Sequence, residues 1–149
     1  MQTDKKFSVG IGVIITRAED NKILIIKENL SNESIGKVAG MYCLPSGHVY
    51  RGEDVTAAAT REALEETGYH IELEAVVGFY QVKGAVGVAF LAKTTDSAPV
   101  IKNDPSEIAS VEWMDPRSVL DLPTRPAVKE AITHYLNNRL FGLDMITIC

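Results

Sequence analysis

One segment, residues 47–69, constrains this 149-residue chain more than any other, and it reads GHVYRGEDVTAAATREALEETGY. The segment predicts a helix between Asp54 and Gly68. Asp is a favoured N-cap residue, and Gly readily takes the left-handed conformation that ends a helix. Ala59 and Ala63 would lie on one edge of this helix, where small side chains allow close packing. We therefore expect the helix to lie against a sheet.

The same helix would carry a concentrated negative charge. At 3.6 residues per turn, Glu62, Glu65 and Glu66 are neighbours on one face. Like charges at these spacings destabilise a helix unless a cation or solvent screens them. A solvated acidic helix is the alternative, but such a helix usually interleaves cations, and Arg61 is the only one here. Carboxylates clustered in this way favour a hard dication with oxygen ligands, Mg²⁺ or Mn²⁺.

This segment resembles the signature box of the Nudix hydrolases, which cleave nucleoside diphosphates linked to another group. The match covers seven charged or glycine positions, namely Gly47, Glu53, Arg61, Glu62, Glu65, Glu66 and Gly68. Ala63 and Tyr69 differ, because the family usually has Ile, Leu or Val there. The approach to the box is also similar, with Tyr42 in place of a common Trp and Ser46 in place of a common Gly. The resemblance extends over about residues 8–122.

The resemblance implies a fold and a set of roles. The fold is an α/β protein, a Nudix-like α/β/α sandwich with a mixed sheet between helices. The implied metal ligands are Glu62, Glu65, Glu66 and the backbone carbonyl of Ser46. Glu53 is implied as a supporting carboxylate, with Arg61 orienting it or a helix glutamate.

The general base remains open between two positions. Members of the family use either a glutamate of the box, here Glu65, or one from a downstream loop. Glu107 is the loop candidate, since it precedes the predicted strand that carries Trp113. An ordinary exposed carboxylate is an equal interpretation of Glu107.

Three further side chains are candidates for substrate binding, each with a structural alternative. Lys27 stands near a strand end, where the family often keeps a basic group facing phosphate, but a solvated lysine is as good an interpretation. Tyr50 occupies a variable position of the box and is otherwise a surface residue. Tyr80 could stack on a base, although strand aromatics more often pack on the sheet.

The rest of the sequence alternates strands and helices. Apolar runs rich in β-branched residues predict strands at 7–16, 22–27, 71–83, 84–93 and 109–114. The first two should pair, and the third and fourth should form a hairpin near Lys83 and Gly84. Polar stretches predict loops at 29–40 and 94–105, and a helical turn should follow Asp115 and Pro116. A 3.6-residue period predicts a C-terminal helix at about 126–140.

Length, charge and cysteine content narrow the class of protein. A chain of 149 residues with these elements is expected to be a single Nudix hydrolase domain, residues 1–149. The net charge of −5 argues against binding to a nucleic-acid duplex. No apolar run is long enough to span a bilayer, and residues 1–7 are too polar for a signal peptide, so we expect no membrane partner and a cytoplasmic location. Cys43 and Cys149 are expected to be free thiols. Exposed strand edges could pair between two copies of the chain and form a homodimer.

Three functions are consistent with these observations. The first is a metal-dependent pyrophosphohydrolase, in which water attacks phosphorus in a nucleoside triphosphate or a nucleoside diphosphate conjugate. The second is a non-catalytic nucleotide sensor on the same fold, against which the intact set of carboxylates argues. The third is isoprenoid diphosphate isomerisation, which would require a reactive cysteine, and Cys43 alone lies near the box. The sequence does not select one nucleotide substrate.

Overall fold

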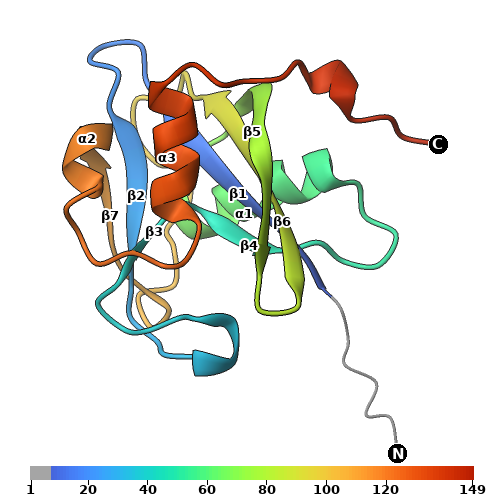
Figure 1. The fold of residues 1–149 in the computed structure, drawn as a ribbon. Helices are drawn as coiled ribbons and strands as arrows, with labels where there is room; N and C mark the ends of the chain where they lie inside the picture. Colours follow the sequence, from blue (N-terminus) through green and yellow to red (C-terminus); the bar gives the residue numbers. More distant parts are fainter. Residues whose placement is uncertain (1–7) are drawn as a thin grey trace, which may run out of the picture.

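A seven-stranded mixed sheet organises the molecule, which a computed structural model describes from residue 8 to residue 149 (Figure 1). Its strands are β1 (Ser8–Thr16), β2 (Ile23–Glu28), β3 (Tyr42–Cys43), β4 (Ser46–His48), β5 (Glu72–Val82), β6 (Ala85–Lys93) and β7 (Ile108–Met114). The main order is β3-β2-β1-β6-β5, while β4 pairs with β1 and β7 pairs with β2. Only β1 and β6 run parallel among the described pairs.

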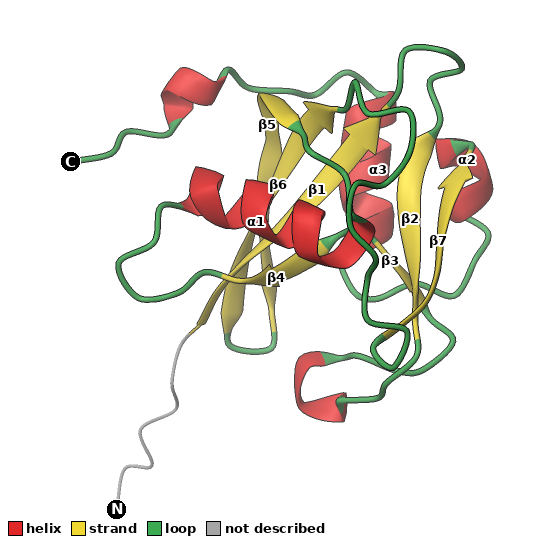
Figure 2. Cartoon of the chain, turned by 180° about the vertical axis from the view of Figure 1, so that it is seen from behind, coloured by secondary structure: helices red, strands yellow, loops and turns green. Residues whose placement is uncertain are grey.

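Helices cover both faces of this sheet, which confirms the predicted α/β/α arrangement with a mixed sheet. Helix α1 (Val55–Thr67) lies on one face, in front in Figure 2, and α3 (Val128–Leu136) lies on the other, in front in Figure 1. The short α2 (Pro116–Val119) packs beside α3. Because strand side chains alternate, Val13 of β1 joins the core under α1, whereas Ile14 joins the core under α3.

Helix α1 packs as its small-residue edge predicts. Ala58, Ala59 and Ala63 are fully buried against the sheet. Gly68 ends the helix in the left-handed conformation, at φ 78°, and its N–H donates to the carbonyl oxygen of Leu64 at 2.9 Å. Asp54 occupies the N-cap position, but its side chain makes no capping hydrogen bond.

The first two strands pair, but much less than expected. The register between β1 and β2 holds only Thr16 opposite Ile23, and the strands then diverge. The β3-β4 segment fills the space between them, with β4 paired to β1 and β3 paired to β2. The long partner of β1 is β6, parallel over residues 8–16. This divergence brings the segment just before α1 to the middle of the sheet.

The β5-β6 hairpin is confirmed. Val82 pairs with Ala85, and the two turn residues both take positive φ, 40° at Lys83 and 79° at Gly84. This combination matches the turn that best follows the twist of two antiparallel strands.

The C-terminal helix is shorter than the predicted 126–140. Ala127 has φ 70°, a left-handed conformation that a helix cannot include, so α3 begins at Val128. Asn138 at φ 54° follows its other end. Beyond it, Phe141 pairs with Val76 on the outer edge of β5. Two short 3-10 helices, η1 (Glu33–Ile35) and η2 (Leu143–Met145), were not predicted.

Two sequence predictions fall on residues 1–7 and so lie outside the described residues. These are the polar N-terminal stretch and Phe7, the first residue of the predicted first strand. Within residues 8–149, no helix combines the length and the apolar character needed to cross a bilayer.

Candidate active site

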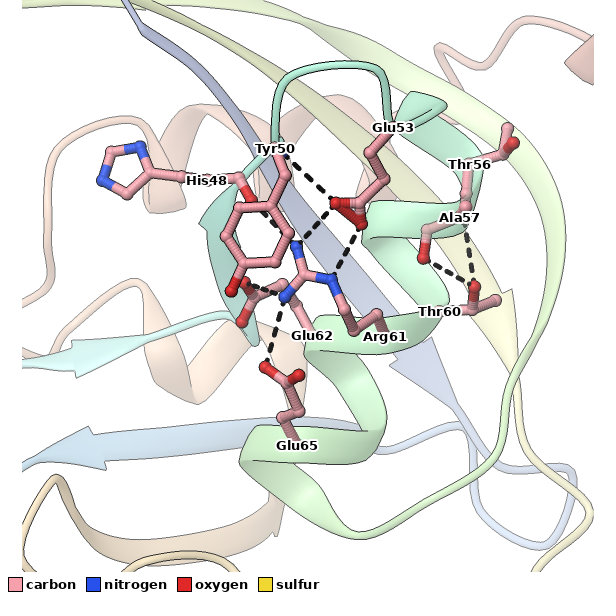
Figure 3. A network of polar contacts seen from close by, with 9 residues as sticks. All are labelled: His48, Tyr50, Glu53, Thr56, Ala57, Thr60, Arg61, Glu62 and Glu65. Atoms are coloured by element: carbon pink, nitrogen blue, oxygen red, sulfur yellow. Dashed lines mark hydrogen bonds and ion pairs between the residues drawn. The ribbon is translucent and has the colours of Figure 1, made fainter.

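Arg61 is the centre of a polar network at the outer side of α1 (Figure 3). Its guanidinium donates two hydrogen bonds to the carboxylate of Glu53, from Nε at 2.8 Å and from Nη2 at 3.0 Å. Nη1 donates to Glu62 at 2.8 Å and to Glu65 at 3.2 Å. Nη2 also reaches the backbone oxygen of His48 at 3.0 Å. The hydrogen bonds that Arg61 donates to Glu53 and Glu62 raise the pKa of Arg61, so one permanent cation fixes three carboxylates of the box.

Tyr50 closes this network from the solvent side. Its ring lies 4.0 Å from the guanidinium carbon of Arg61, and its backbone N–H donates to Glu53 at 3.2 Å. The hydrogen bond from Arg61 is the main cause of the lowered pKa of Glu53. Tyr50, predicted to bind substrate, is therefore placed as a cover over Arg61, and a substrate contact remains a prediction.

Gly47 is required by the position of Glu62. A Cβ atom built on Gly47 would overlap the carboxyl group of Glu62, so a larger residue at position 47 would force that carboxyl group to move from the position it has here. Burial is the main cause of the raised pKa of Glu62, and Arg61 opposes it. Gly47 and Glu62 are thus one structural unit, although fifteen positions separate them.

Glu66 lies apart from the Arg61 network and faces the interior. Its Oε1 accepts a hydrogen bond from the backbone N–H of Ser46 at 3.3 Å. Its Oε2 is buried and has no hydrogen-bond partner among the described residues. Burial, with the nearby charges of Glu62 and Glu28, raises the pKa of Glu66 well above its ordinary value. An unpaired buried carboxylate is costly, and a bound cation would relieve that cost.

The carboxylates fit a divalent cation in their chemistry, although they are not assembled around one point. Within the described chain, no group of three acidic, His or Cys side chains is arranged to hold a metal. Glu62 and Glu65 point to Arg61, while Glu66 points to Ser46. The side chain of Glu65 is 53% exposed, and its carboxylate would have to leave Arg61 to meet a cation beside Glu66. The Ser46 carbonyl stays a predicted ligand.

A second charged group, which the sequence did not reveal, surrounds Glu28 at the end of β2. Glu28 is only 2% exposed. Its Oε2 lies 3.0 Å from Lys37 Nζ, an ion pair without good hydrogen-bond geometry, and its Oε1 lies 3.5 Å from Arg125 Nη1. The only sequence signal was a glutamate two positions after the apolar run of β2, where a fully buried charge needs partners.

A pocket of about 450 Å³ lies on the α3 side of the sheet, and Arg61, Glu53, Glu62 and Glu65 are not among its lining residues. Glu66 and Ser46 contribute to its wall, together with Glu28, Lys37 and Arg125. Small residues of β1 and β6 form its floor, with Gly10 beside Gly87 and Gly12 beside Ala89. Side chains are absent or short along this floor, and the pocket occupies the space that larger residues would fill.

The structure places the remaining predicted residues differently with respect to this pocket. Tyr80 lines it, and its hydroxyl lies 2.6 Å from Nδ1 of His134. Lys27 is not among the lining residues, because its ammonium group lies over the ring of Tyr42 at 5.5 Å. Glu107 is exposed and also outside the lining, and its backbone oxygen accepts from Asn29 at 2.9 Å. Their functional roles remain predictions.

Comparison with known proteins assigns the class of this fold and site. The NUDIX domain model matches residues 6–135. The chain therefore belongs to the Nudix hydrolase family, whose members act on phosphoanhydride bonds.

Individual relatives are moderately similar. Nudix hydrolase 6 of Arabidopsis thaliana is 27% identical over 120 residues, which are 77% of this chain and 41% of that protein. A Bacillus subtilis protein named as a candidate 8-oxo-dGTP diphosphatase is 32% identical over 110 residues, 74% of this chain and 68% of that one. A solved NUDIX hydrolase from Nitrosomonas europaea aligns with a TM-score of 0.80 at 25% identity, covering 97% of this chain and 98% of that chain. The chain spans less than half the length of the Arabidopsis relative.

Proposed function

We propose that this protein is a divalent-metal-dependent pyrophosphohydrolase that uses water to cleave a diphosphate linkage in a nucleotide. The observation that carries the proposal is the buried carboxylate of Glu66, which has an unpartnered oxygen at the wall of a pocket large enough for a small ligand. A structural carboxylate would be expected to have its partners within the protein. A carboxylate oxygen kept without a partner, as Oε2 of Glu66 is, is suited to a cation that arrives with the substrate.

Each residue of the box has a distinct role in this proposal. Glu62, Glu65 and Glu66 would hold Mg²⁺ or Mn²⁺ together with the Ser46 carbonyl. The bound dication would supply charge neutralisation of the diphosphate and a lowered pKa of bound water. Arg61 keeps Glu62 and Glu53 in a fixed geometry through the hydrogen bonds described above.

The proton acceptor for the attacking water is proposed to be Glu65 or Glu107. Glu65 is close to the other box carboxylates and is exposed enough to change its contacts. Glu107 is outside the pocket lining and would have to approach with its loop. Glu107→Gln separates the two, because a pH–rate profile identical to the wild type leaves Glu65 as the acceptor.

The nature of the substrate is proposed only as a class. The name of the Bacillus subtilis relative suggests an oxidised nucleoside triphosphate. Solved structures that are 18 to 20% identical include one complexed with ADP ribose and one Ap4A hydrolase, and at that identity the likeness shows the fold alone. A panel of nucleoside triphosphates, nucleotide sugars and dinucleoside polyphosphates, ranked by kcat/KM with Mg²⁺ and with Mn²⁺, would identify the preferred group.

The same panel tests hydrolysis itself. The wild type is expected to release a nucleoside monophosphate or pyrophosphate from at least one compound in Mg²⁺, and Glu66→Gln is expected to lower kcat at least a hundredfold. Binding of a nucleotide without turnover by the wild type would instead support the nucleotide sensor. Turnover by Glu66→Gln equal to that of the wild type would contradict the assignment of Glu66.

Isoprenoid diphosphate isomerisation has no support from the cysteine it would require. Cys43 is buried, and burial raises the pKa of its thiol to about 11. The reactive form of cysteine is the thiolate, which is scarce at neutral pH for such a group. We therefore do not propose this reaction.

A further inference from the structure

We propose that Lys37 and Arg125, positioned by the buried Glu28, form an anion subsite that binds a phosphate group of the substrate. The inference deepens the proposed function, and it rests on that function for the identity of the ligand as a nucleoside di- or triphosphate. Neither cation belongs to the box, and they come from two loops that are far apart in the sequence.

The first observation is the way these loops are joined. Lys37 closes a turn of the loop after β2, where its backbone exchanges two hydrogen bonds with Asn32, at 2.7 and 3.0 Å. Arg125 precedes α3, and its backbone N–H donates to Tyr42 at 3.1 Å. The two loops touch, since a Cβ on Gly36 would lie 3.4 Å from the ring of Pro126. Both cations are therefore held at fixed positions on the pocket wall.

The second observation is the balance of charge. Glu28 neutralises one of the two cations that contact it, so the group of three carries a net positive charge. Among the described residues that line the pocket, Lys37, Lys83 and Arg125 are cationic, whereas Glu28 and Glu66 are the carboxylates. The chain as a whole has a net charge of −5. Lys37 and Arg125 thus form a basic wall of the pocket inside a protein of net negative charge, and this favours an anionic ligand in the pocket.

The third observation is the position of this basic wall relative to Glu66. Glu66 and the Glu28 group line the same pocket, and the side chains of Lys37 and Arg125 are largely buried. A diphosphate needs a metal cation, which Glu66 would hold, and hydrogen-bond donors for its remaining oxygens. Lysine and arginine supply such donors, and the hydrogen bonds are strengthened by charge.

A purely structural role is the competing explanation, because Glu28 could hold the two loops together through Lys37 and Arg125 without any ligand being bound. The two explanations differ in one measurable property. If Lys37 and Arg125 form a ligand site, removing either cation must lower the affinity for phosphate. If their role is only structural, removing either one must lower only the stability of the protein.

The test is the affinity of the purified full chain for inorganic pyrophosphate, measured by isothermal titration calorimetry in EDTA so that no dication takes part. Lys37→Met and Arg125→Met are each expected to weaken binding about tenfold or more, the loss of one charge-assisted hydrogen bond. Lys93→Met is the matched control. It removes one positive charge from the end of β6, where Lys93 lies 3.9 Å from the exposed Glu72, and should change the affinity less than twofold.

Glu28→Gln tests the positioning role. Removing a negative charge beside an anion site would by itself tighten binding. If Glu28 positions the two cations, pyrophosphate binding weakens instead. Tighter or unchanged binding would overturn this part of the proposal.

Folding is controlled with a second variant. Arg125→Met leaves Glu28 with only one of its two cationic partners, Lys37, so the double variant Glu28→Gln/Arg125→Met removes both charges and should unfold at a temperature close to that of the wild type. It is expected to retain the loss of pyrophosphate affinity. Affinity equal to the wild type in this variant and in Lys37→Met would overturn the proposal, as would a larger loss in Lys27→Met than in Lys37→Met.

The outcome is independent of the proposed activity. Glu66→Gln is expected to abolish turnover without weakening metal-free pyrophosphate binding. If no nucleotide is hydrolysed by the wild type but the two cation variants lose pyrophosphate affinity, the proposed function fails and the anion subsite stands.

Discussion

At the scale of single residues, one guanidinium organises most of the box. Arg61 holds Glu53 through two parallel hydrogen bonds and reaches Glu62 and Glu65 with the third nitrogen. The planar fork of arginine makes this geometry available, whereas the single ammonium of lysine does not. The charge of Arg61 thus offsets part of the repulsion between neighbouring carboxylates, and Glu66 alone remains outside its reach.

The first prediction concerns this fork. Arg61→Lys keeps the charge but loses the paired hydrogen bonds, so the free energy of unfolding should fall by about 1–3 kcal/mol. The rate of nucleotide hydrolysis should fall more than tenfold, because Glu53 and Glu62 lose their fixed positions. Chemical denaturation and steady-state kinetics measure the two effects. Arg117→Lys, at an exposed position of α2, serves as the control and should change neither quantity.

The second prediction concerns the pH dependence of stability without metal. The pKa of Glu66 in the folded protein is raised above its ordinary value of 4.5, so the folded state binds the proton more tightly than the unfolded state. Stability should therefore fall as pH rises from about 4.5 through the raised pKa. Glu66→Gln should lose this part of the dependence. Thermal unfolding in EDTA between pH 4.5 and 8 checks it, and parallel curves for the two proteins would contradict the assignment.

At the scale of elements, the divergence of β1 from β2 creates the site. The two strands pair only at Thr16 and Ile23, and the β3-β4 segment enters the space between them. That segment delivers Ser46 to Glu66 and Gly47 to Glu62, while the small residues of β1 and β6 leave the pocket open. A helix from one face of the sheet thereby contributes a carboxylate to a pocket on the other.

The sequence predicted those elements whose signals are local. Helix α1 has its small-residue edge and its terminal glycine, and the β5-β6 hairpin has its turn residues, so both are confirmed. Strands β3 and β4 are too short to show a period of two. Helix α3 begins only after Ala127, because Ala127 has a left-handed conformation that the residue preferences of alanine do not indicate. The parallel pairing of β1 with β6 joins segments that lie far apart in the chain, and pairing of that kind leaves no local signal.

The residues of the site likewise differ in how local their signals are. The box could be recognised because its seven positions lie at fixed spacings within one helix of about four turns and the residues on either side of it. The group around Glu28 could not be, since Lys37 and Arg125 meet it only through tertiary structure. Sequence reasoning offered Lys27 as a candidate for substrate binding, with a solvated lysine as an equal interpretation, and its role stays a prediction. Lys37 and Arg125, which line the pocket, had no local signal.

The third prediction tests whether the pocket floor is the substrate site. A Cβ on Gly87 would have ordinary van der Waals contacts, 3.7 Å from the backbone oxygen of Tyr80 and 4.0 Å from the backbone oxygen of Gly10. Gly87→Val should therefore fold, since valine favours strands, but its side chain would fill part of the pocket. We expect KM for the preferred nucleotide to rise about tenfold, with the melting temperature close to the wild type. An unchanged KM would place the substrate elsewhere.

At the scale of the whole molecule, charge is distributed unevenly. A chain with a net charge of −5 surrounds a pocket whose described lining has more cations than carboxylates. In the proposed function this arrangement suits a ligand that brings its own dication, because Glu66 would receive the metal and Lys37 and Arg125 would receive phosphate oxygens. The predicted homodimer stays a prediction. Part of the outer edge of β5 is already occupied, since Val76 pairs with Phe141.

The most direct test of the central claim is a titration of the full chain with Mn²⁺, followed by electron paramagnetic resonance, for the wild type, Glu66→Gln and the control Glu72→Gln on the exposed end of β5. The account predicts that the wild type and Glu72→Gln bind Mn²⁺ with the same affinity and that Glu66→Gln binds it at least tenfold more weakly. Equal Mn²⁺ affinity in all three proteins would contradict the claim that Glu66 of α1 holds a divalent cation at this pocket.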